Sequence, residues 1–190
     1  EGTEWLHVKI LEAKIALSRD PAWLKKNTVL GLDFGDAEVP VMPAMLPRNE
    51  KGEARTAAEI DNAISYQMYE RKKFVPPPNA VIADLYAAQG DLLYALGRPT
   101  RGADSLGDPA YSYEQALKYG AVRQSLVQQR KQTFEKSEAA SSYDLARAAP
   151  EAAKRAEHWH AAFLPGILVL LSALAAAAFY VWRPRRPKQT

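Results

Sequence analysis

Pairs of aspartates are the residues of this chain whose type and spacing come closest to catalytic chemistry. They occur at Asp33/Asp36, Asp84/Asp91 and Asp104/Asp108. Two carboxylates can serve as general acid and base when they face each other across a cleft. Spacing along a sequence does not establish such a cleft, and solvated helix faces explain these acids more simply.

Other catalytic and metal-binding patterns are missing from the sequence. It has no Cys, which excludes disulfides, thiolate nucleophiles and zinc sites built on sulfur. It contains no HExxH, GxSxG, P-loop or GxGxxG motif. His7 falls in an apolar helical segment, and His158 and His160 flank Trp159 in a pattern that suits a membrane interface better than a metal site. We therefore expect no enzyme activity and no bound cofactor or metal.

Charge is distributed unevenly along the 190 residues. The net charge is +3, and four of the 25 basic residues lie within 183–190. All 22 acidic residues precede residue 161, so residues 1–160 carry 21 basic and 22 acidic side chains. Nucleic-acid binding normally needs a basic face or stripe. The distribution therefore argues against a nucleic-acid partner.

Residues 161–182 contain no charged side chain and are mostly Leu, Ile, Val, Phe and Ala. As a helix rising about 1.5 Å per residue they would cover about 33 Å, enough for a hydrocarbon core of about 30 Å. Trp159 lies on one flank, and Tyr180, Trp182 and Arg183 lie on the other, which is typical of residues at membrane interfaces. We predict one transmembrane helix, with the lipid bilayer as a partner.

The flanking charges predict the orientation of this helix. Residues 183–190 hold four Lys or Arg, against three within 145–160. Lys and Arg favour the cytoplasmic side of a membrane. We therefore expect a single-pass protein of the plasma (inner) membrane, with a basic cytoplasmic tail at 183–190 and a periplasmic soluble part. The alternative is a tail-anchored protein whose soluble part faces the cytosol.

Apolar residues at helical spacing predict helices throughout the soluble part. A first helix carries a stripe of Trp5, Val8, Leu11, Ile15 and Leu17, and it ends at Asp20-Pro21. Further helices are predicted over 22–34, 54–74 and 110–136. Pro and Gly predict a non-helical insert at 35–53 and a linker at 98–109. The Ala-rich, charged residues 137–160 predict a helical stalk before the membrane.

Two stretches resemble the tetratricopeptide repeat (TPR), in which one helix ends in Ala-Leu-x-x-Asp-Pro and the next carries Leu-Gly-x-x-Tyr. The first stretch has Ala16-Leu17-Ser18-Arg19-Asp20-Pro21, followed by Leu30-Gly31-Leu32-Asp33-Phe34. In the second, the positions of the first repeat helix are occupied by Tyr86, Gly90, Leu93 and Gly97, and Tyr113 and Ala116 match the second helix. Gln89 and the long turn at 98–109 depart from the pattern.

The resemblance implies an all-α fold in which residues 1–136 form antiparallel helix pairs, as a fragment of a right-handed solenoid. It implies packing roles within the repeats for Ala16, Pro21, Leu30, Gly31, Phe34, Tyr86, Gly90, Leu93, Tyr113 and Ala116. It places Lys25, Thr28, Asp84, Ala87, Asp91 and Tyr94 on the concave surface that would bind a partner. Because the chain opens on what resembles the second helix of a repeat, we expect earlier repeats before Glu1.

Two functions fit these observations. The first is a membrane-anchored interaction or scaffold module that binds a protein or peptide partner through its helical repeats. The alternative is a structural subunit of a membrane protein complex that assembles through the transmembrane helix. There Ala173 and residues 175–178 form a run of small side chains, which allows close helix packing in lipid.

Overall fold

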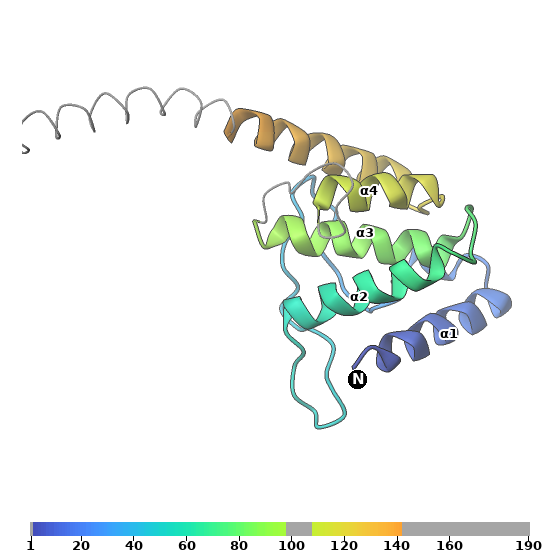
Figure 1. Ribbon diagram of the computed structural model, residues 1–190. Helices are drawn as coiled ribbons and strands as arrows, with labels where there is room; N and C mark the ends of the chain where they lie inside the picture. Colours follow the sequence, from blue (N-terminus) through green and yellow to red (C-terminus); the bar gives the residue numbers. More distant parts are fainter. Residues whose placement is uncertain (1, 98–107, 142–190) are drawn as a thin grey trace, which may run out of the picture. The chain divides into compact units, whose positions relative to one another are not determined.

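The computed structural model describes residues 2–97 and 108–141. The chain divides into two compact units, Glu1–Ala140 and Ser141–Thr190, and the description below concerns the first. Its elements are α1 (Glu4–Arg19), the 3-10 helix η1 (Trp23–Lys25), α2 (Ala57–Arg71), α3 (Ala80–Ala95), α4 (Pro109–Lys118) and a helix over residues 124–141 (Figure 1). The predicted all-α class is confirmed.

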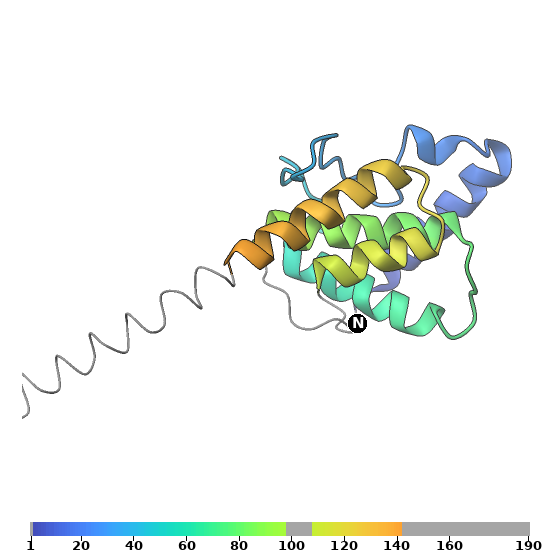
Figure 2. The same ribbon diagram turned by 90° about the horizontal axis from the view of Figure 1, so that it is seen from above.

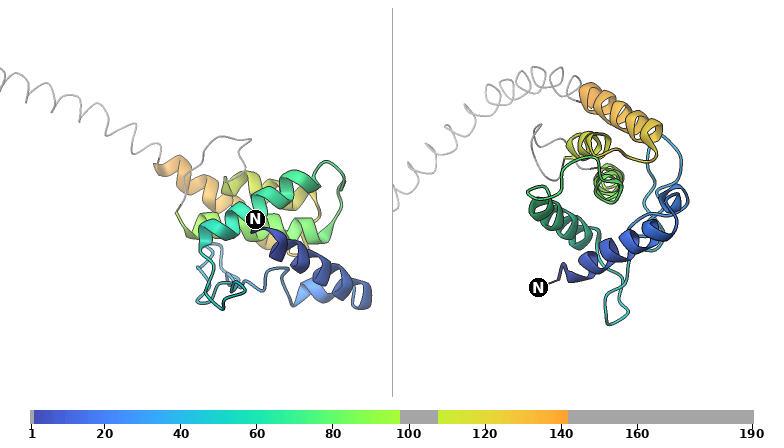
Figure 3. Two further views of the ribbon diagram at one scale, coloured as in Figure 1. Left: turned by 60° about the horizontal axis from the view of Figure 1, so that its bottom comes forward. Right: turned by 90° about the vertical axis from the view of Figure 1, so that its right-hand side faces the viewer.

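Helix α3 forms the centre of the unit. Most of its 16 residues are buried, which is the pattern of a helix packed on several sides. Helix α4 packs antiparallel against it, and α2 packs on another side (Figures 1 and 2). An end-on view places α3 inside a ring formed by α1, α2, α4 and the 124–141 helix (Figure 3). Side chains that point from α3 toward this ring are therefore shielded from water.

The helix predicted over 54–74 is confirmed as α2. Thr56 and Glu59 form a capping box at its start: the Thr56 side chain accepts from the Glu59 amide at 3.2 Å, and the Glu59 carboxylate accepts from the Thr56 amide at 2.6 Å. Ile60, Ile64 and Met68 form its buried face, at the spacing that the sequence predicts. The absence of helix from 35–53 is also confirmed.

Helix α1 ends at Arg19, as Asp20-Pro21 predicts, but its predicted buried stripe is wrong. The residues buried in α1 are Leu6, Ile10 and Ala13. Val8, Leu11 and Ile15 lie on the opposite face and are about half exposed. The sequence contains two apolar stripes at helical spacing, and periodicity alone does not tell which one faces the core.

The helix predicted over 22–34 is replaced by the short η1 and an irregular segment. Gly31 has φ +66°, a left-handed conformation that an α-helix excludes. From Leu30 onward every second side chain is buried, and Leu30, Leu32 and Phe34 point inward. That period of two belongs to extended backbone, so Leu-Gly-Leu-Asp-Phe does not form a repeat helix.

The single helix predicted over 110–136 is two helices. Helix α4 ends at Lys118, and Gly120 follows with φ +84°. The Gly120 amide donates to the Leu117 carbonyl, and the Ala121 amide donates to the Ala116 carbonyl, each at 3.0 Å. These two bonds form a Schellman motif, which ends α4 and lets the chain turn back as the 124–141 helix.

Several predictions fall on residues outside the described ranges. They are most of the linker 98–109, residues 142–160 of the stalk, the span 161–182 and the tail 183–190. Among the residues that the structure does describe, no helix has the length and apolarity needed to cross a bilayer.

Candidate functional site

One face of α3 carries four of the residues that the sequence predicts for partner binding. Asp84, Ala87, Asp91 and Tyr94 follow one another at helical spacing and therefore line one side of the helix. The segment 28–38 and the 124–141 helix contact this side. The predicted binding surface of α3 is thus covered by the chain itself.

Arg130 makes the central contact of this covered face. Its guanidinium lies 2.5 Å from the Asp91 carboxylate and donates to the carbonyl oxygens of Gly35 at 2.5 Å and Ala37 at 3.0 Å. The Tyr113 hydroxyl donates to the other Asp91 oxygen at 2.9 Å. Arg130 is 2% exposed and Asp91 is 6% exposed. We call this group the Arg130 clamp, since it joins α3, α4, the 35–37 loop and the 124–141 helix.

The titration behaviour of the clamp follows from its burial. Burial raises the pKa of Asp91, and the Arg130 charge and the Tyr113 hydroxyl oppose that rise. Burial, and then the Asp91 charge, raise the pKa of Tyr113, so its hydroxyl keeps its proton and acts as a donor. The clamp is therefore a closed set of matched donors and acceptors, which suits a structural role.

Further contacts join the loop 35–38 and α3 to the chain that follows α4. Arg123 pairs with Asp36 at 3.3 Å, and the Thr133 hydroxyl donates to Glu38 at 3.2 Å. The rings of Tyr94 and Phe134 meet edge to face, with centroids 5.1 Å apart. The loop 35–38 and the 124–141 helix consequently form one packed layer over α3.

Asp84 lies at the other end of the covered face. Its carboxylate accepts from the Val29 amide at 2.7 Å. Burial raises the pKa of Asp84 to about 6, and the Val29 bond and the Arg123 charge oppose this rise. The carboxylate fixes the start of the segment 28–38 on α3.

Replacing Asp84 by Asn is predicted to stabilise the fold at neutral pH. The pKa of Asp84 is raised to about 6 from its ordinary value of 3.8, so between these values the folded state binds a proton more tightly than the unfolded state. The free energy of unfolding of the wild type therefore falls as pH rises through this window. Asn can accept the Val29 bond without a charge, so we expect a gain on the order of 2 kcal/mol at pH 7.

Urea unfolding of both chains, below pH 4 and at pH 7, tests this prediction. The two chains should have similar stability at the lower pH and should differ at the higher one. An advantage of the Asn variant that is the same at both pH values would assign the effect to something other than the Asp84 charge.

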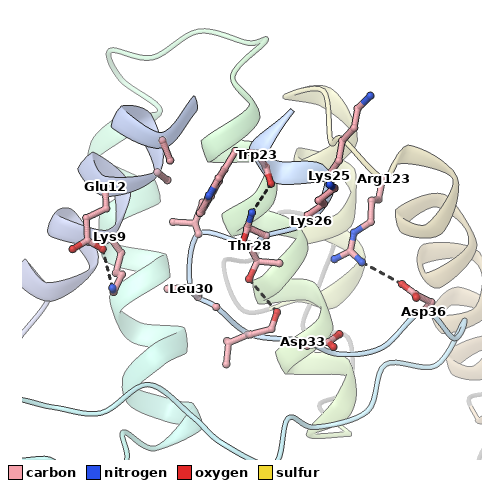
Figure 4. A pocket seen from close by; sticks show the side chains of 16 residues that line it. Lys9, Glu12, Trp23, Lys25, Lys26, Thr28, Leu30, Asp33, Asp36 and Arg123 are labelled. Carbon is pink, nitrogen blue, oxygen red and sulfur yellow. Dashed lines mark hydrogen bonds and ion pairs between the residues drawn. The ribbon is translucent and has the colours of Figure 1, made fainter. Parts of the chain in front are cut away.

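A groove opens between α1 and the segment 23–36. It encloses about 770 Å³. Figure 4 shows Lys9 and Glu12 of α1 on one side, and Arg123 and Asp36 on the other, with Trp23 and Thr28 between them. We call it the Trp23 groove. Of the residues predicted for partner binding, Lys25 and Thr28 line it, and the four from α3 do not.

Most charges that line the Trp23 groove already have partners. Lys9 pairs with Glu12 at 2.8 Å, Arg123 pairs with Asp36, and Asp33 accepts from the Gly35 amide at 2.9 Å. Lys25 and Lys26 are exposed and form no ion pair within the described part of the chain. Asp33 has no cation partner there either, so the two lysines leave the groove with an excess of one positive charge.

The residues predicted to pack within the second repeat-like stretch lie in α3 and α4. Tyr86, Gly90, Leu93, Tyr113 and Ala116 are all buried where α3 meets α4. A Cβ atom at Gly90 would lie 2.7 Å from the Tyr113 ring, so glycine is what lets the two helices approach this closely.

The packing residues predicted from the first repeat-like stretch do not lie in a pair of helices. Leu30 and Phe34 are buried, but in extended backbone. Ala16 is half-buried on α1, and Pro21 and Gly31 are exposed.

A second buried polar cluster was not predicted from the sequence. The Gln89 amide donates to Asp61 at 2.9 Å and to Ser65 at 2.8 Å, and its carbonyl accepts from Ser112 at 3.4 Å. This cluster joins α2, α3 and α4. Gln89 stands where the repeat pattern has Leu, and this departure was the one sign in the sequence of a buried polar contact there.

The remaining candidates have local roles or lie outside the described residues. Asp108 caps α4 by accepting from the Ala110 amide at 2.8 Å. His7 contacts the Arg71 guanidinium at 2.8 Å. Residues 2–97 and 108–141 contain no group of three or more His, Asp or Glu placed to hold a metal. Trp159, Tyr180, Trp182 and Arg183, predicted at the membrane interface, lie outside these ranges.

Comparison with protein-family models, with curated proteins and with solved structures finds no match to the chain.

Proposed function

We propose that this chain is a helical interaction module that binds a protein or peptide partner in the Trp23 groove. The observation that carries the proposal is a groove of about 770 Å³ in which Lys25 and Lys26 outnumber Asp33 among the lining charges that form no ion pair in the described part of the chain. Such a groove suits an extended segment with acidic side chains, since charge complementarity orients partners and excludes wrong ones. The partly buried ring of Trp23 adds an apolar surface of the kind that anchors binding.

Binding, rather than catalysis, is the proposed activity of this groove. The Thr28 hydroxyl, the one side-chain hydroxyl in its lining, donates to the Leu32 carbonyl at 3.1 Å. Of the lining acids, Glu12 and Asp36 each pair with a cation, and Asp33 accepts from the Gly35 amide at 2.9 Å. A nucleophile needs a base within hydrogen-bond reach, and these contacts direct the candidate groups elsewhere.

The TPR-like arrangement remains part of the proposal for α3 and α4. The burial of Tyr86, Leu93 and Ala116, and the close approach at Gly90, support a repeat-like pair there. We also propose that residues 161–182 anchor the module in the inner membrane, with the groove on the periplasmic side. The absence of charge from 161–182 and the basic residues of 183–190 support this part.

The proposal is tested by photo-crosslinking in the full chain. A benzophenone amino acid replaces Glu12, which lines the groove, or Lys14, which is two residues further along α1 and does not. We expect a covalent adduct with one partner segment from position 12 and not from position 14. Adducts of equal yield from both positions would contradict a partner in the groove.

Charge reversal at Lys25 and Lys26 gives the matching prediction for affinity. The double change to Glu should lower the adduct yield from position 12 by about tenfold, which corresponds to about 1.4 kcal/mol of lost attraction. Lys14→Glu/Lys51→Glu alters the net charge equally at exposed positions outside the groove, and it should leave the yield unchanged. If both double variants lowered the adduct yield equally, the loss would come from the net charge of the chain and not from the groove.

A further inference from the structure

A second cavity opens between α4 and the 124–141 helix, which run side by side (Figures 1 and 2). It encloses about 280 Å³. No described residue of its lining is basic, and none of them lines the Trp23 groove. The charged and aromatic side chains around it are Asp108, Glu114, Glu135, Glu138, Tyr111 and Phe134. We call it the Asp108 pocket.

Asp108 brings to this pocket a carboxylate oxygen that has no partner. Its side chain is 0% exposed. Oδ1 accepts from the Ala110 amide at 2.8 Å and caps α4, but the buried Oδ2 has no hydrogen-bond partner in the described part of the chain. A buried acceptor left unpaired costs free energy, and a donor that enters the pocket would remove this cost. Asp108 therefore points to a ligand in addition to its role as a helix cap.

The charges of the lining favour a cation as that ligand. Asp108 and the exposed Glu114 form no ion pair within the described residues, whereas Glu135 pairs with Lys131 at 2.9 Å. A metal ion is the less suitable cation. The described residues hold no group of three or more carboxylates or imidazoles placed to ligate one. An organic cation that donates hydrogen bonds fits better.

Two aromatic rings in the lining favour one kind of organic cation. Tyr111 packs edge to face against Tyr86, with ring centroids 6.5 Å apart, and Phe134 packs in the same way against Tyr94 at 5.1 Å. These contacts hold the rings in place beside the carboxylates. A guanidinium can donate two hydrogen bonds along its edge while its flat face contacts a ring, and an ammonium has no such face. The lining therefore suits a guanidinium.

We propose that the Asp108 pocket binds a guanidinium group, which donates to Oδ2 of Asp108 and to the carboxylate of Glu114. An arginine side chain of a partner polypeptide and a free alkylguanidine share this chemistry. The pocket has no lining residue in common with the Trp23 groove, so the proposal is independent of the function proposed for that groove.

Titration of the full chain with butylguanidinium and with butylurea tests the charge of the ligand. The two probes have nearly the same shape, and only the first is a cation. A 3-fluorotyrosine at position 111 reports binding by fluorine NMR at millimolar probe, far below the concentrations at which guanidinium unfolds proteins. We expect a saturable shift from butylguanidinium and none from butylurea. Equal shifts from both probes, or no saturable shift, would overturn the proposal.

Asp108→Asn tests the carboxylate, with Asp20→Asn as the matched control. Asp20 likewise accepts from the amide two residues on, Ala22, at 2.9 Å, but it does not line the pocket. Asn is an equally good helix cap, so circular dichroism should stay unchanged. The affinity for butylguanidinium should fall about tenfold in Asp108→Asn and should not change in Asp20→Asn. Equal affinity of Asp108→Asn and the wild type would overturn the proposal.

Two further measurements identify the source of the guanidinium. Tighter binding of a blocked Gly-Arg-Gly peptide than of butylguanidinium would support a partner polypeptide, and weaker binding would support a free alkylguanidine. Arg98 and Arg101 of this chain lie outside the described residues. Binding of butylguanidinium that appears only after both are changed to Gln would mean that the chain fills the pocket itself, and it would overturn the proposal.

Discussion

Replacing Arg130 by Met is expected to lower the free energy of unfolding by about 3–5 kcal/mol, the usual cost of removing one partner from a buried ion pair. The Asp91 carboxylate, only 6% exposed, would keep the Tyr113 hydroxyl and lose its counterion. The carbonyl oxygens of Gly35 and Ala37 would lose a donor as well. The side chain of Met fills similar space, so most of the loss comes from unpaired polar groups rather than from a cavity.

Urea unfolding followed by circular dichroism measures this loss, with Arg123→Met as the matched control. Arg123 pairs with Asp36 at the surface, where the two side chains are 43% and 91% exposed, and such pairs contribute about 1 kcal/mol or less. Adding Asp91→Leu to Arg130→Met removes the stranded charge and should restore part of the stability. A loss at Arg130 no larger than the loss at Arg123 would contradict the clamp.

Replacing Gly90 by Ala is expected to destabilise the protein by about 1–3 kcal/mol, although Ala is the better helix former by about 1 kcal/mol. The new Cβ would lie 2.7 Å and 2.8 Å from two carbons of the Tyr113 ring. That ring is fully buried, and its hydroxyl is bonded to Asp91. It cannot move aside without breaking this bond, so α3 and α4 would have to separate.

A double-mutant cycle isolates this contact. Tyr113→Leu removes the ring, and on that background Gly90→Ala should cost little or should stabilise the helix. The coupling between the two sites should therefore be large, as it is for residues in direct contact. Thermal unfolding of the four chains gives the coupling. A Gly90→Ala chain as stable as the wild type would show that α3 and α4 do not approach as closely as described.

The extents of α1 and α2 were the predictable part of this structure because their signals are local. The capping box at Thr56 and Glu59 and the buried series Ile60, Ile64 and Met68 lie within fifteen residues of one another and determine α2. Pro21 ends α1 in the same local way. The sequence also carries a signal for the break at Gly120, which the prediction of one helix over 110–136 did not use. A glycine between two apolar helical stretches permits the left-handed turn that ends α4.

The segment after η1 shows how a family resemblance can obscure a simpler pattern. Leu30-Gly31 matches the Leu-Gly of a repeat helix, yet the burial of Leu30, Leu32 and Phe34 has the period of extended backbone. Both patterns are present in five residues, and only tertiary packing chooses between them. The two stripes of α1 present the same ambiguity, because either stripe could have faced the core.

The site residues were less predictable because their partners are distant in the sequence. Asp84 and Asp91 were selected as open binding residues, but Val29 is 55 residues from Asp84, and Arg130 is 39 residues from Asp91. Arg130 did carry a signal: it falls between Val127 and Phe134 at the spacing of a buried helical face. A basic residue at such a position indicates a buried counterion, but the sequence does not say which acid supplies it.

The bonds of Arg130 to Ala37 and Gly35, which span 93 and 95 residues, also bear on the order in which the molecule folds. Closing a loop of that length costs chain entropy before any bond within it returns energy. We therefore expect α2, α3 and α4 to assemble first through their shorter-range contacts. The segment 23–36, which forms one side of the Trp23 groove, would be fixed only when the 124–141 helix docks. The groove would therefore be the last feature of this unit to form.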